Sequence, residues 1–292
     1  CFDPAAERPL TYDLSALLGP VSSFYTLLPD KKGHVWITNS QGLVEGIPDG
    51  KGGYTFHVWR NNPANPHSLG YNATLSLCEA PVLPDRYLWV GTKGGGLNRL
   101  DKTSGQFFQL HTRNSDLPND VVYGILPDEA GNLWVSTNRG LSRVTLPRDD
   151  ADPPDPRSFY FQNYRAADGL QDDEFNTGAY FRCPDGQLMF GGVNGLTAFY
   201  PKQLPKRNND APVHITDLKI NNQSHNVQEP EGMLKLPYDQ NTLTIEFALL
   251  DFANPKENRY RYRLKGADPD WVEAGTRHFA NYTRLGPGAY RF

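Results

Sequence analysis

Short apolar stretches, each ended by a turn, recur along the first two thirds of the chain. The clearest example is in residues 116–145, where an apolar run at 121–126 is followed by Asp128, Gly131 and Asn132. A run that is apolar at nearly every position is typical of a strand buried on both faces. Asp, Gly and Asn close together are typical of a tight hairpin turn. Two further short strands follow, so this stretch predicts three antiparallel strands joined by two tight turns.

The same order of strand, turn and strand occurs four times. Each copy has a large side chain on an apolar strand, then a turn that contains glycine, then Gly-Leu at the start of the next strand. The other three copies are residues 33–46, 86–101 and 186–201. The equivalent large side chains are Trp36, Trp89, Trp134 and Met189, which are 45 to 55 residues apart. A four-stranded unit that repeats every roughly 40–50 residues is the signature of a β-propeller blade.

We therefore predict an all-β fold in which residues 1–205 form propeller repeats. The fourth repeat has no recognisable outer strand, so these blades are expected to be four blades of a larger, seven-type propeller. An incomplete ring exposes sheet edges, which favours self-association. The expected blades cover residues 22–60, 73–112, 120–165 and 175–200.

Residues 206–292 have a different pattern, which begins with a polar hinge. Apolar and polar positions alternate in 243–249 and 260–264, as in half-buried strands. Short strands separated by Gly- and Pro-containing turns are typical of a β-sandwich. The prediction is an immunoglobulin-like sandwich with Trp271 and Tyr282 in its core.

Both ends of the chain are expected to be cuts in a longer polypeptide. Residue 1 is not methionine, and Phe292 lies inside an apolar stretch. The sandwich is therefore expected to be truncated at its C-terminus.

The third repeat resembles the two-component-regulator propeller repeat of large bacterial hybrid sensor kinases. That repeat has a Leu-Pro start, an apolar strand, Asp-x-x-Gly-x-Leu-Trp, and Gly-Thr-x-x-Gly-Leu. The matching residues are Leu117, Pro118, Asp128, Gly131, Leu133, Trp134, Gly140 and Leu141, and residues 90–97 match the second half in full. Asp120 departs from the usual Asn, and Ser136 departs from the usual Gly.

Residues 243–292 resemble the tyrosine-rich, immunoglobulin-like domain that follows the propellers in the same sensors. The match is carried by Tyr-x-Tyr-x-Leu-x-Gly at 260–266, Asp-x-x-Trp at 268–271 and Leu-Gly-Pro-Gly-x-Tyr at 285–290. The family more often has Pro-Pro-Gly or Ala-Pro-Gly in the last motif.

Together the two resemblances imply the periplasmic, extracytoplasmic part of a hybrid two-component sensor histidine kinase and response regulator. Such a region recognises an oligosaccharide ligand and relays the signal across the inner membrane to regulate polysaccharide utilisation. The resemblance also implies a homodimer and a membrane-anchored parent chain, although this part of it is soluble. The fragment itself is expected to be non-catalytic.

Composition mainly excludes other classes of protein. The formal net charge of −4 gives no reason to expect nucleic acid as a partner. No run of 18 apolar residues could span a membrane, and the N-terminus lacks a signal-peptide pattern. The three cysteines have no metal-ligand spacing, so neither a metal nor a cofactor is expected. Cys78 and Cys183 lie in apolar segments and are predicted to be small buried residues rather than a disulfide.

Residues that could do chemistry are few. The seven histidines form no ligand set for zinc. The acidic run at 149–155 could hold Ca²⁺, but two prolines and no glycine favour a solvated loop. Residues 172–174, Asp-Asp-Glu, could act as the acid–base pair of a glycosidase, but a charged loop before a strand is favoured. The glycine-rich segment 91–96 precedes no helix, which argues against a phosphate loop.

Binding is the function that remains, because loops on a rigid scaffold commonly carry it. Aromatic rings stack on sugars, while Arg and Asn side chains hydrogen-bond hydroxyl and carboxylate groups. The candidate ligand-binding residues are Arg113, Asn119, Tyr123, Asn138, Arg139, Phe175 and Asn194. Asn119 in particular suits an alternative role in bracing a turn. The alternative functions are a propeller enzyme that acts on polysaccharide and a non-catalytic assembly module.

Overall fold

The computed structural model describes residues 2–3, 8–9, 11–19, 23–147, 154–204, 212–225, 234–249, 258 and 260–292. Two compact units, Cys1–Leu204 and Pro205–Phe292, make up the chain, and each is described by itself. Among the described residues, no helix has the length and hydropathy needed to cross a membrane.

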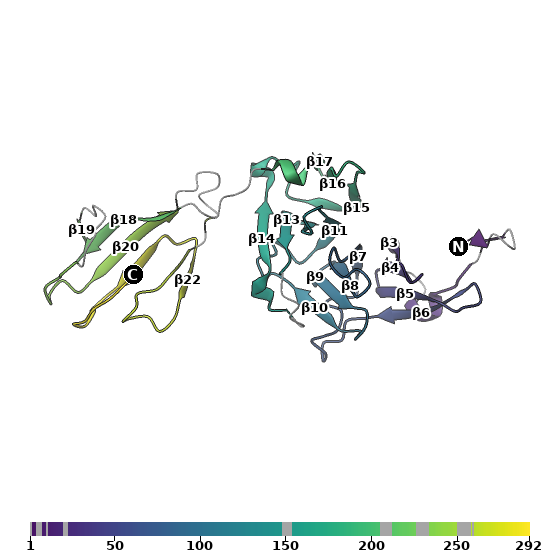
Figure 1. The fold of residues 1–292 in the computed structure, drawn as a ribbon, viewed down its shortest axis with the longest axis horizontal. Helices are drawn as coiled ribbons and strands as arrows, with labels where there is room; N and C mark the ends of the chain where they lie inside the picture. The colour runs from purple at the N-terminus through teal and green to yellow at the C-terminus, as the bar shows by residue number, and fades with distance from the viewer. Residues whose placement is uncertain are drawn as a thin grey trace. The chain divides into compact units, whose positions relative to one another are not determined.

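The first unit opens with the two-residue strands β1 (Phe2–Asp3) and β2 (Arg8–Pro9) and the short helix α1 (Ser15–Leu18). Four antiparallel sheets follow, and within each the strands are neighbours in chain order (Figure 1). Blade 1 contains β3 (Phe24–Pro29), β4 (Val35–Asn39), β5 (Gly42–Pro48) and β6 (Tyr54–Trp59). Blade 2 contains β7 (Thr74–Glu79), β8 (Tyr87–Thr92), β9 (Leu97–Asp101) and β10 (Phe107–Leu110).

Blades 3 and 4 continue the same order. Blade 3 contains β11 (Val122–Pro127), β12 (Leu133–Thr137), β13 (Gly140–Thr145) and β14 (Tyr160–Tyr164). Blade 4 contains β15 (Phe175–Arg182), β16 (Leu188–Gly192) and β17 (Gly195–Phe199), and no fourth strand pairs with β17 in the described part of the chain. The first strands β3, β7, β11 and β15 contact one another, which places them innermost. The all-β propeller class predicted from the sequence is confirmed.

The repeated tryptophan forms the centre of each interface between blades. Trp36 of blade 1 shares a buried cluster with Leu77 and Leu88 of blade 2. Trp89 of blade 2 likewise packs with the inner strands of blade 3, and Trp134 of blade 3 with Leu188 of blade 4. All three indole rings are almost fully buried. The interfaces between blades, rather than single blades, therefore form the hydrophobic core of this unit.

The aspartate of the repeat closes a turn and accepts a hydrogen bond from the tryptophan. In blade 3, Asp128 accepts hydrogen bonds from the Asn132 amide at 2.9 Å and from Trp134 Nε1 at 3.0 Å. In blade 1, Asp30 accepts from Trp36 Nε1 at 3.1 Å. A buried indole N–H without an acceptor is costly, and in blades 1 and 3 the Asp six positions before the Trp supplies the acceptor. Blade 2 has Leu83 at that position, and the buried Trp89 Nε1 has no hydrogen-bond partner among the described residues.

Blade 4 departs from this pairing at both positions. Met189 replaces the tryptophan, and Cys183 stands where blades 1 and 3 have the aspartate. Cys183 is half-buried and follows the end of β15, so its predicted position as a buried residue within a strand is wrong. Since Met has no N–H to satisfy, this turn needs no buried acceptor.

Cys78 is buried in β7, as predicted, and neither Cys78 nor Cys183 is in a disulfide. Burial raises the pKa of the Cys78 thiol to about 12, so almost none of it is thiolate near neutral pH. In a variant whose other two cysteines are replaced by serine, we expect native-state alkylation at pH 8 to be at least about 100-fold slower than in denaturant. Mass spectrometry of timed iodoacetamide reactions measures this ratio, and equal rates in both conditions would contradict the buried position.

The second unit is a small two-sheet assembly. Its larger sheet has the order β19-β18-β20-β23, and its smaller sheet pairs β21 with β22. These strands are β18 (Val213–Ile220), β19 (Gln223–His225), β20 (Leu243–Leu249), β21 (Tyr260–Tyr262), β22 (Val272–Gly275) and β23 (Phe279–Tyr282). Its buried core consists of Ile245, Phe247, Tyr262 and Ala280.

The two predicted core residues of this unit have different positions. Tyr282 packs against the core, and its hydroxyl donates to Asp268 at 2.5 Å. Trp271 is 52% exposed, so the prediction that it is a core residue is wrong. It immediately precedes β22 and lies on the outer surface, where the Arg261 guanidinium stacks over its ring at 5.0 Å.

Candidate functional site

Antiparallel strands in chain order divide the loops of a blade between its two ends. The turns between first and second strands, and between third and fourth strands, lie at one end. The turns between second and third strands lie at the other end, together with the links between blades. We call this second end the upper loop face. It comprises residues 40–41, 93–96, 138–139 and 193–194 and the links 60–73, 111–121 and 165–174.

All seven candidate ligand-binding residues lie at this end of the blades. Arg113 and Asn119 are in the link between blades 2 and 3, and Tyr123 is near the start of β11. The others are Asn138 and Arg139 in the β12–β13 turn, Phe175 at the start of β15, and Asn194 in the β16–β17 turn. Their shared position follows from strand order, which the repeat pattern encodes.

Backbone hydrogen bonds join neighbouring segments of the upper loop face. The Gly140 amide donates to the Asp173 carbonyl at 2.6 Å, and the Val193 amide donates to the Glu174 carbonyl at 3.3 Å. The link between blades 3 and 4 therefore holds the β12–β13 and β16–β17 turns beside it. This arrangement brings the side chains of Asn138, Arg139 and Asn194 to one region on a fixed scaffold.

Tyr123 and Asn138 form the centre of this region. The Tyr123 hydroxyl donates to Asn138 Oδ1 at 2.6 Å. Burial, together with the nearby Glu174 carboxylate, raises the pKa of the Tyr123 hydroxyl, which keeps the phenol protonated and able to donate. Because its Oδ1 is engaged, the exposed Asn138 presents its amide N–H groups outward.

Exposed donors flank this pair. The side chains of Arg139 and Asn194 are exposed, while their backbones are held in place. The Asn194 amide donates to Gln171 Oε1 at 2.7 Å, and the Arg139 carbonyl accepts a hydrogen bond from Arg165. The Tyr123–Asn138 pair and the exposed side chains of Arg139 and Asn194 thus lie at the same end of the blades, on segments that backbone hydrogen bonds join.

Two predicted site residues have structural roles. Phe175 is only 1% exposed and packs edge-on against Phe190 in the interface between blades 3 and 4, so the prediction that its ring contacts a ligand is wrong. The physical reason is that the first residue of β15 points into the interface rather than toward the loops. Asn119 Oδ1 accepts from the Val121 amide at 2.8 Å, which is the turn-bracing role. Arg113 is exposed in the neighbouring link.

Tyr71 is a surface aromatic residue that the sequence did not single out. It is exposed in the link between blades 1 and 2, and its ring lies in van der Waals range of Gly94 in the β8–β9 turn. The signal that could have identified Tyr71 in the sequence is a tyrosine ahead of the glycine-rich turn of the same repeat.

The acidic residues considered for catalysis brace the loops. Asp173 Oδ1 accepts from the Ala166 amide at 2.7 Å, and Asp172 Oδ1 accepts from the Asp173 amide at 2.6 Å. Asp173 also lies 3.7 Å from the Arg165 guanidinium. These bonds favour the loop interpretation over a glycosidase pair.

The candidate Ca²⁺ run falls largely outside the described residues, which include none of Asp149, Asp150 and Asp152. Asp155, its last member, accepts a hydrogen bond from the Arg157 amide at the start of the short helix η1 (Pro156–Ser158). Within the described ranges, no group of three His, Cys, Asp or Glu side chains is arranged to hold a metal ion.

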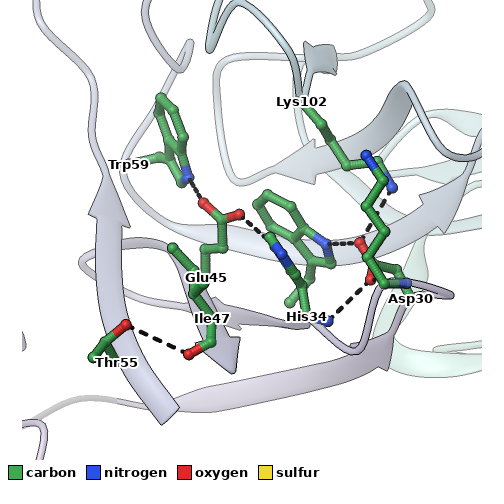
Figure 2. A network of polar contacts seen from close by, with 9 residues as sticks. Asp30, His34, Glu45, Ile47, Thr55, Trp59 and Lys102 are labelled. Carbon is green, nitrogen blue, oxygen red and sulfur yellow. Dashed lines mark hydrogen bonds and ion pairs between the residues drawn. The ribbon is translucent and has the colours of Figure 1, made fainter. Parts of the chain in front are cut away.

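A second polar cluster lies at the opposite end, between blades 1 and 2. Figure 2 shows Glu45 accepting hydrogen bonds from His34 Nδ1 at 2.8 Å and from Trp59 Nε1 at 3.1 Å. Lys102 of blade 2 reaches the buried Asp30 carboxylate of blade 1 at 3.4 Å. Burial alone would raise the pKa of Asp30, but hydrogen bonds from Trp36 and His34 and the charge of Lys102 hold it below its ordinary value. This cluster joins two blades and does not face the upper loops.

Comparison with known proteins finds similarity in both parts of the chain. Residues 116–139 match the model of the two component regulator propeller, and residues 251–292 match the Y_Y_Y domain. "Histidine kinase P4" of Formosa agariphila is 28% identical over 197 residues, which cover 64% of this chain and 14% of the relative. The chain thus spans about one seventh of the length of that protein.

Solved structures that resemble this chain are more distant in sequence. PorZ, a bacterial surface component of the type-IX secretion system of Porphyromonas gingivalis, is 13% identical with a TM-score of 0.51, over 99% of this chain and 39% of that one. The extracellular domain assigned to a hybrid two component system of B. thetaiotaomicron is 16% identical with a TM-score of 0.44, over 99% of this chain and 43% of that one. The PorZ likeness concerns the fold alone.

Proposed function

Because the chain joins a two component regulator propeller to a Y_Y_Y domain, we propose that it is the sensing region of a membrane-bound hybrid sensor histidine kinase. The order of these two domains is the observation that carries the proposal, and the 28% identity to a histidine kinase supports it. In this role the region is periplasmic and non-catalytic, and kinase activity belongs to another part of the parent chain. The parent chain acts as a homodimer.

The ligand in this proposal is an oligosaccharide bound on the upper loop face. The exposed amide of Asn138, the guanidinium of Arg139 and the half-buried phenol of Tyr123 suit the hydroxyl groups and ring faces of sugars. Backbone bonds already order the loops that carry them, so little conformational entropy is lost on binding. The signal that follows regulates polysaccharide utilisation.

Signalling requires that the ligand bind one arrangement of the dimer more tightly than another. A ligand with equal affinity for two states shifts neither, however tightly it binds. Each kcal/mol of difference between the two affinities changes the ratio of the two states about fivefold. The output of the kinase then follows the population of the favoured arrangement.

Calorimetric titration of the purified chain with plant and host oligosaccharides tests this proposal. We expect at least one glycan to bind, and we expect Tyr123→Phe and Asn138→Ala each to weaken binding about fivefold, since each removes one hydrogen bond of roughly 1 kcal/mol. Gln106→Ala is the control, because that side chain is exposed at the opposite end of blade 2. Failure of every glycan to bind, or binding that both site variants retain in full, would contradict the proposal.

The same samples test the non-catalytic role. After prolonged incubation with any glycan that binds, we expect no new reducing ends by chromatography. Cleavage that disappears in Asp173→Ala or Glu174→Ala would instead favour a propeller enzyme, because carboxyl pairs cleave glycosidic bonds.

A further inference from the structure

An exposed tyrosine, Tyr71, lies in the link between blades 1 and 2 on the upper loop face. It is 47% exposed. Of the exposed large hydrophobic side chains, tyrosine included, only Tyr71 and Val193 belong to the loops of this face, all of which the structure describes. Tyr71 is therefore the exposed aromatic residue of these loops, and the half-buried Tyr123 is not.

Hydrogen bonds fix the backbone next to the Tyr71 ring. The Gly70 amide donates to Asn98 Oδ1 at 2.8 Å, and Asn98 Nδ2 donates to the Gly95 carbonyl at 3.0 Å. Asn98 is fully buried in β9, so it ties the link to the β8–β9 turn. On the other side, Asn61 Nδ2 donates to the Leu69 carbonyl at 2.8 Å. A side chain on a backbone held in this way loses little conformational entropy when a ligand binds.

The glycine-rich β8–β9 turn lies directly against this segment. A Cβ atom at Gly95 would lie 2.5 Å from the Gly70 carbonyl carbon and 2.8 Å from the Tyr71 amide nitrogen. Only glycine at position 95 allows the two backbones to come so close. A Cβ atom at Gly94 would lie 3.7 Å from two atoms of the Tyr71 ring, so the ring lies beside the turn.

Backbone contacts also connect this turn with the segment that carries Tyr123. The Gly96 amide donates to the Asp120 carbonyl at 2.9 Å. Lys93, in the same turn, forms an isolated β-bridge with Val121, which precedes Tyr123 by two residues. Both tyrosines therefore belong to one continuous, hydrogen-bonded set of loops.

The surroundings of the exposed ring favour a sugar over an apolar partner. Lys93 and Gly94 beside it are exposed, and the loops of the upper face at blades 1 and 2 contain no second exposed large hydrophobic side chain. A surface that docks a protein by apolar contact needs a contiguous patch of roughly a few hundred Å² or more, which one tyrosine does not supply. A pyranose has a face of C–H groups that can stack on a single aromatic ring, while its hydroxyl groups stay in water.

We propose that Tyr71 is an aromatic platform that stacks on one pyranose ring of the oligosaccharide bound by the upper loop face. This inference rests on the proposed function and adds to it a second subsite, at the junction of blades 1 and 2. The apolar face of the sugar packs on the phenol ring, and other sugars of the same chain contact the Tyr123–Asn138 pair. An oligosaccharide long enough to reach both subsites therefore binds more tightly than a shorter one.

Three substitutions separate stacking from other roles of Tyr71. Tyr71→Ala removes the ring, Tyr71→Phe removes only the hydroxyl group, and Tyr71→Trp supplies a larger ring. Because the residue is exposed, each variant is expected to fold, and circular dichroism checks this. The matched control is Tyr160→Ala, since Tyr160 is also 47% exposed but begins β14 at the opposite end of blade 3.

Calorimetric titration of the whole chain with plant and host oligosaccharides, among them cellotetraose, mannotetraose and a chondroitin tetrasaccharide, gives the first outcome. For a glycan that binds, we expect Tyr71→Ala to weaken binding about fivefold, as for the loss of one aromatic stack. Tyr71→Phe, Tyr71→Trp and Tyr160→Ala are expected to bind within about twofold of the wild-type chain or more tightly. Tyr71→Ala combined with Asn138→Ala is expected to lose about 25-fold, because the two residues contact different sugars.

Saturation-transfer NMR on the same glycan separates stacking from a change in loop structure. We expect the C–H protons of one sugar to lose their signal in Tyr71→Ala and to keep it in Tyr71→Phe. Full binding by Tyr71→Ala, an equal loss in Tyr71→Phe, or an unchanged pattern of proton signals in Tyr71→Ala would overturn the platform. If Asn138→Ala still weakens binding in those cases, the proposed function stands without it. If no oligosaccharide binds the wild-type chain, the proposed function and the platform both fail.

Discussion

Replacement of Gly140 by alanine is expected to lower the free energy of unfolding of the propeller by about 3 kcal/mol or more. Gly140 opens β13 with a φ of 95°, a conformation that side-chain-bearing residues rarely adopt. A Cβ atom there would lie 2.1 Å from the Tyr164 carbonyl oxygen of β14. Relief of this clash requires β14 to move away from β13. Urea unfolding followed by tryptophan fluorescence measures the loss.

Gly195→Ala is the matched control in blade 4. Gly195 opens β17 at the equivalent position with a φ of 127°, but no atom lies within 4 Å of the site of its Cβ. In the described structure blade 4 has no outer strand, which in the other blades lies against the glycine that opens the third strand. We expect a loss of about 1 kcal/mol, from backbone conformation alone. Equal losses for the two variants would show that contact with the outer strand does not explain the Gly-Leu motif.

Replacement of Asp128 by alanine is expected to have the next largest effect, about 3 kcal/mol. The buried Asp128 carboxylate accepts hydrogen bonds from the amides of Ala130 and Asn132, from Asn132 Nδ2 and from Trp134 Nε1. Alanine leaves the indole N–H and the Asn132 amide buried without an acceptor, and each such group costs roughly 1 kcal/mol or more. The urea midpoint and the fluorescence maximum of the native protein both report the change.

Asp185→Ala controls for the loss of an aspartate from the corresponding turn of blade 4. Asp185 is exposed and accepts from the Gln187 amide and the Tyr200 hydroxyl, with no tryptophan among its partners. We expect a loss below about 1 kcal/mol. If Asp185→Ala were as destabilising as Asp128→Ala, the bond to the indole would not be the reason for the Asp–Trp pairing.

The blades could be predicted from the sequence because each short strand and turn carries its own signal. Trp36, Trp89 and Trp134 recur with the Gly-Leu turns, and all three indoles occupy equivalent interfaces. These features depend on local turn chemistry and strand period, which a single repeat encodes. The exposed fraction of a side chain depends instead on which blade packs against it. Met189 has the position of a buried tryptophan but is half-buried, because no blade covers that face in the described structure.

The candidate site was less predictable because one residue type serves two purposes. Asn119 and Asn138 are both asparagines at the same end of the blades, yet Asn119 braces its own turn while Asn138 accepts from Tyr123. Only the positions of the surrounding amides distinguish them. The predictions for Phe175 and Trp271 are wrong for a related reason. An aromatic residue at the end of a strand can point into the core or toward solvent, and its own sequence position does not decide which.

The most direct test of ligand sensing is autophosphorylation of the full-length protein that contains this chain, measured in membrane vesicles. The glycan that binds most tightly in calorimetry would be titrated against the rate of phosphate transfer from ATP, with Gln106→Ala as the control. We predict that the glycan changes the rate, and that Asn138→Ala needs about fivefold more glycan for half of the change, as expected for one lost hydrogen bond. A rate that does not respond to a glycan bound by the upper loop face would contradict the proposed function.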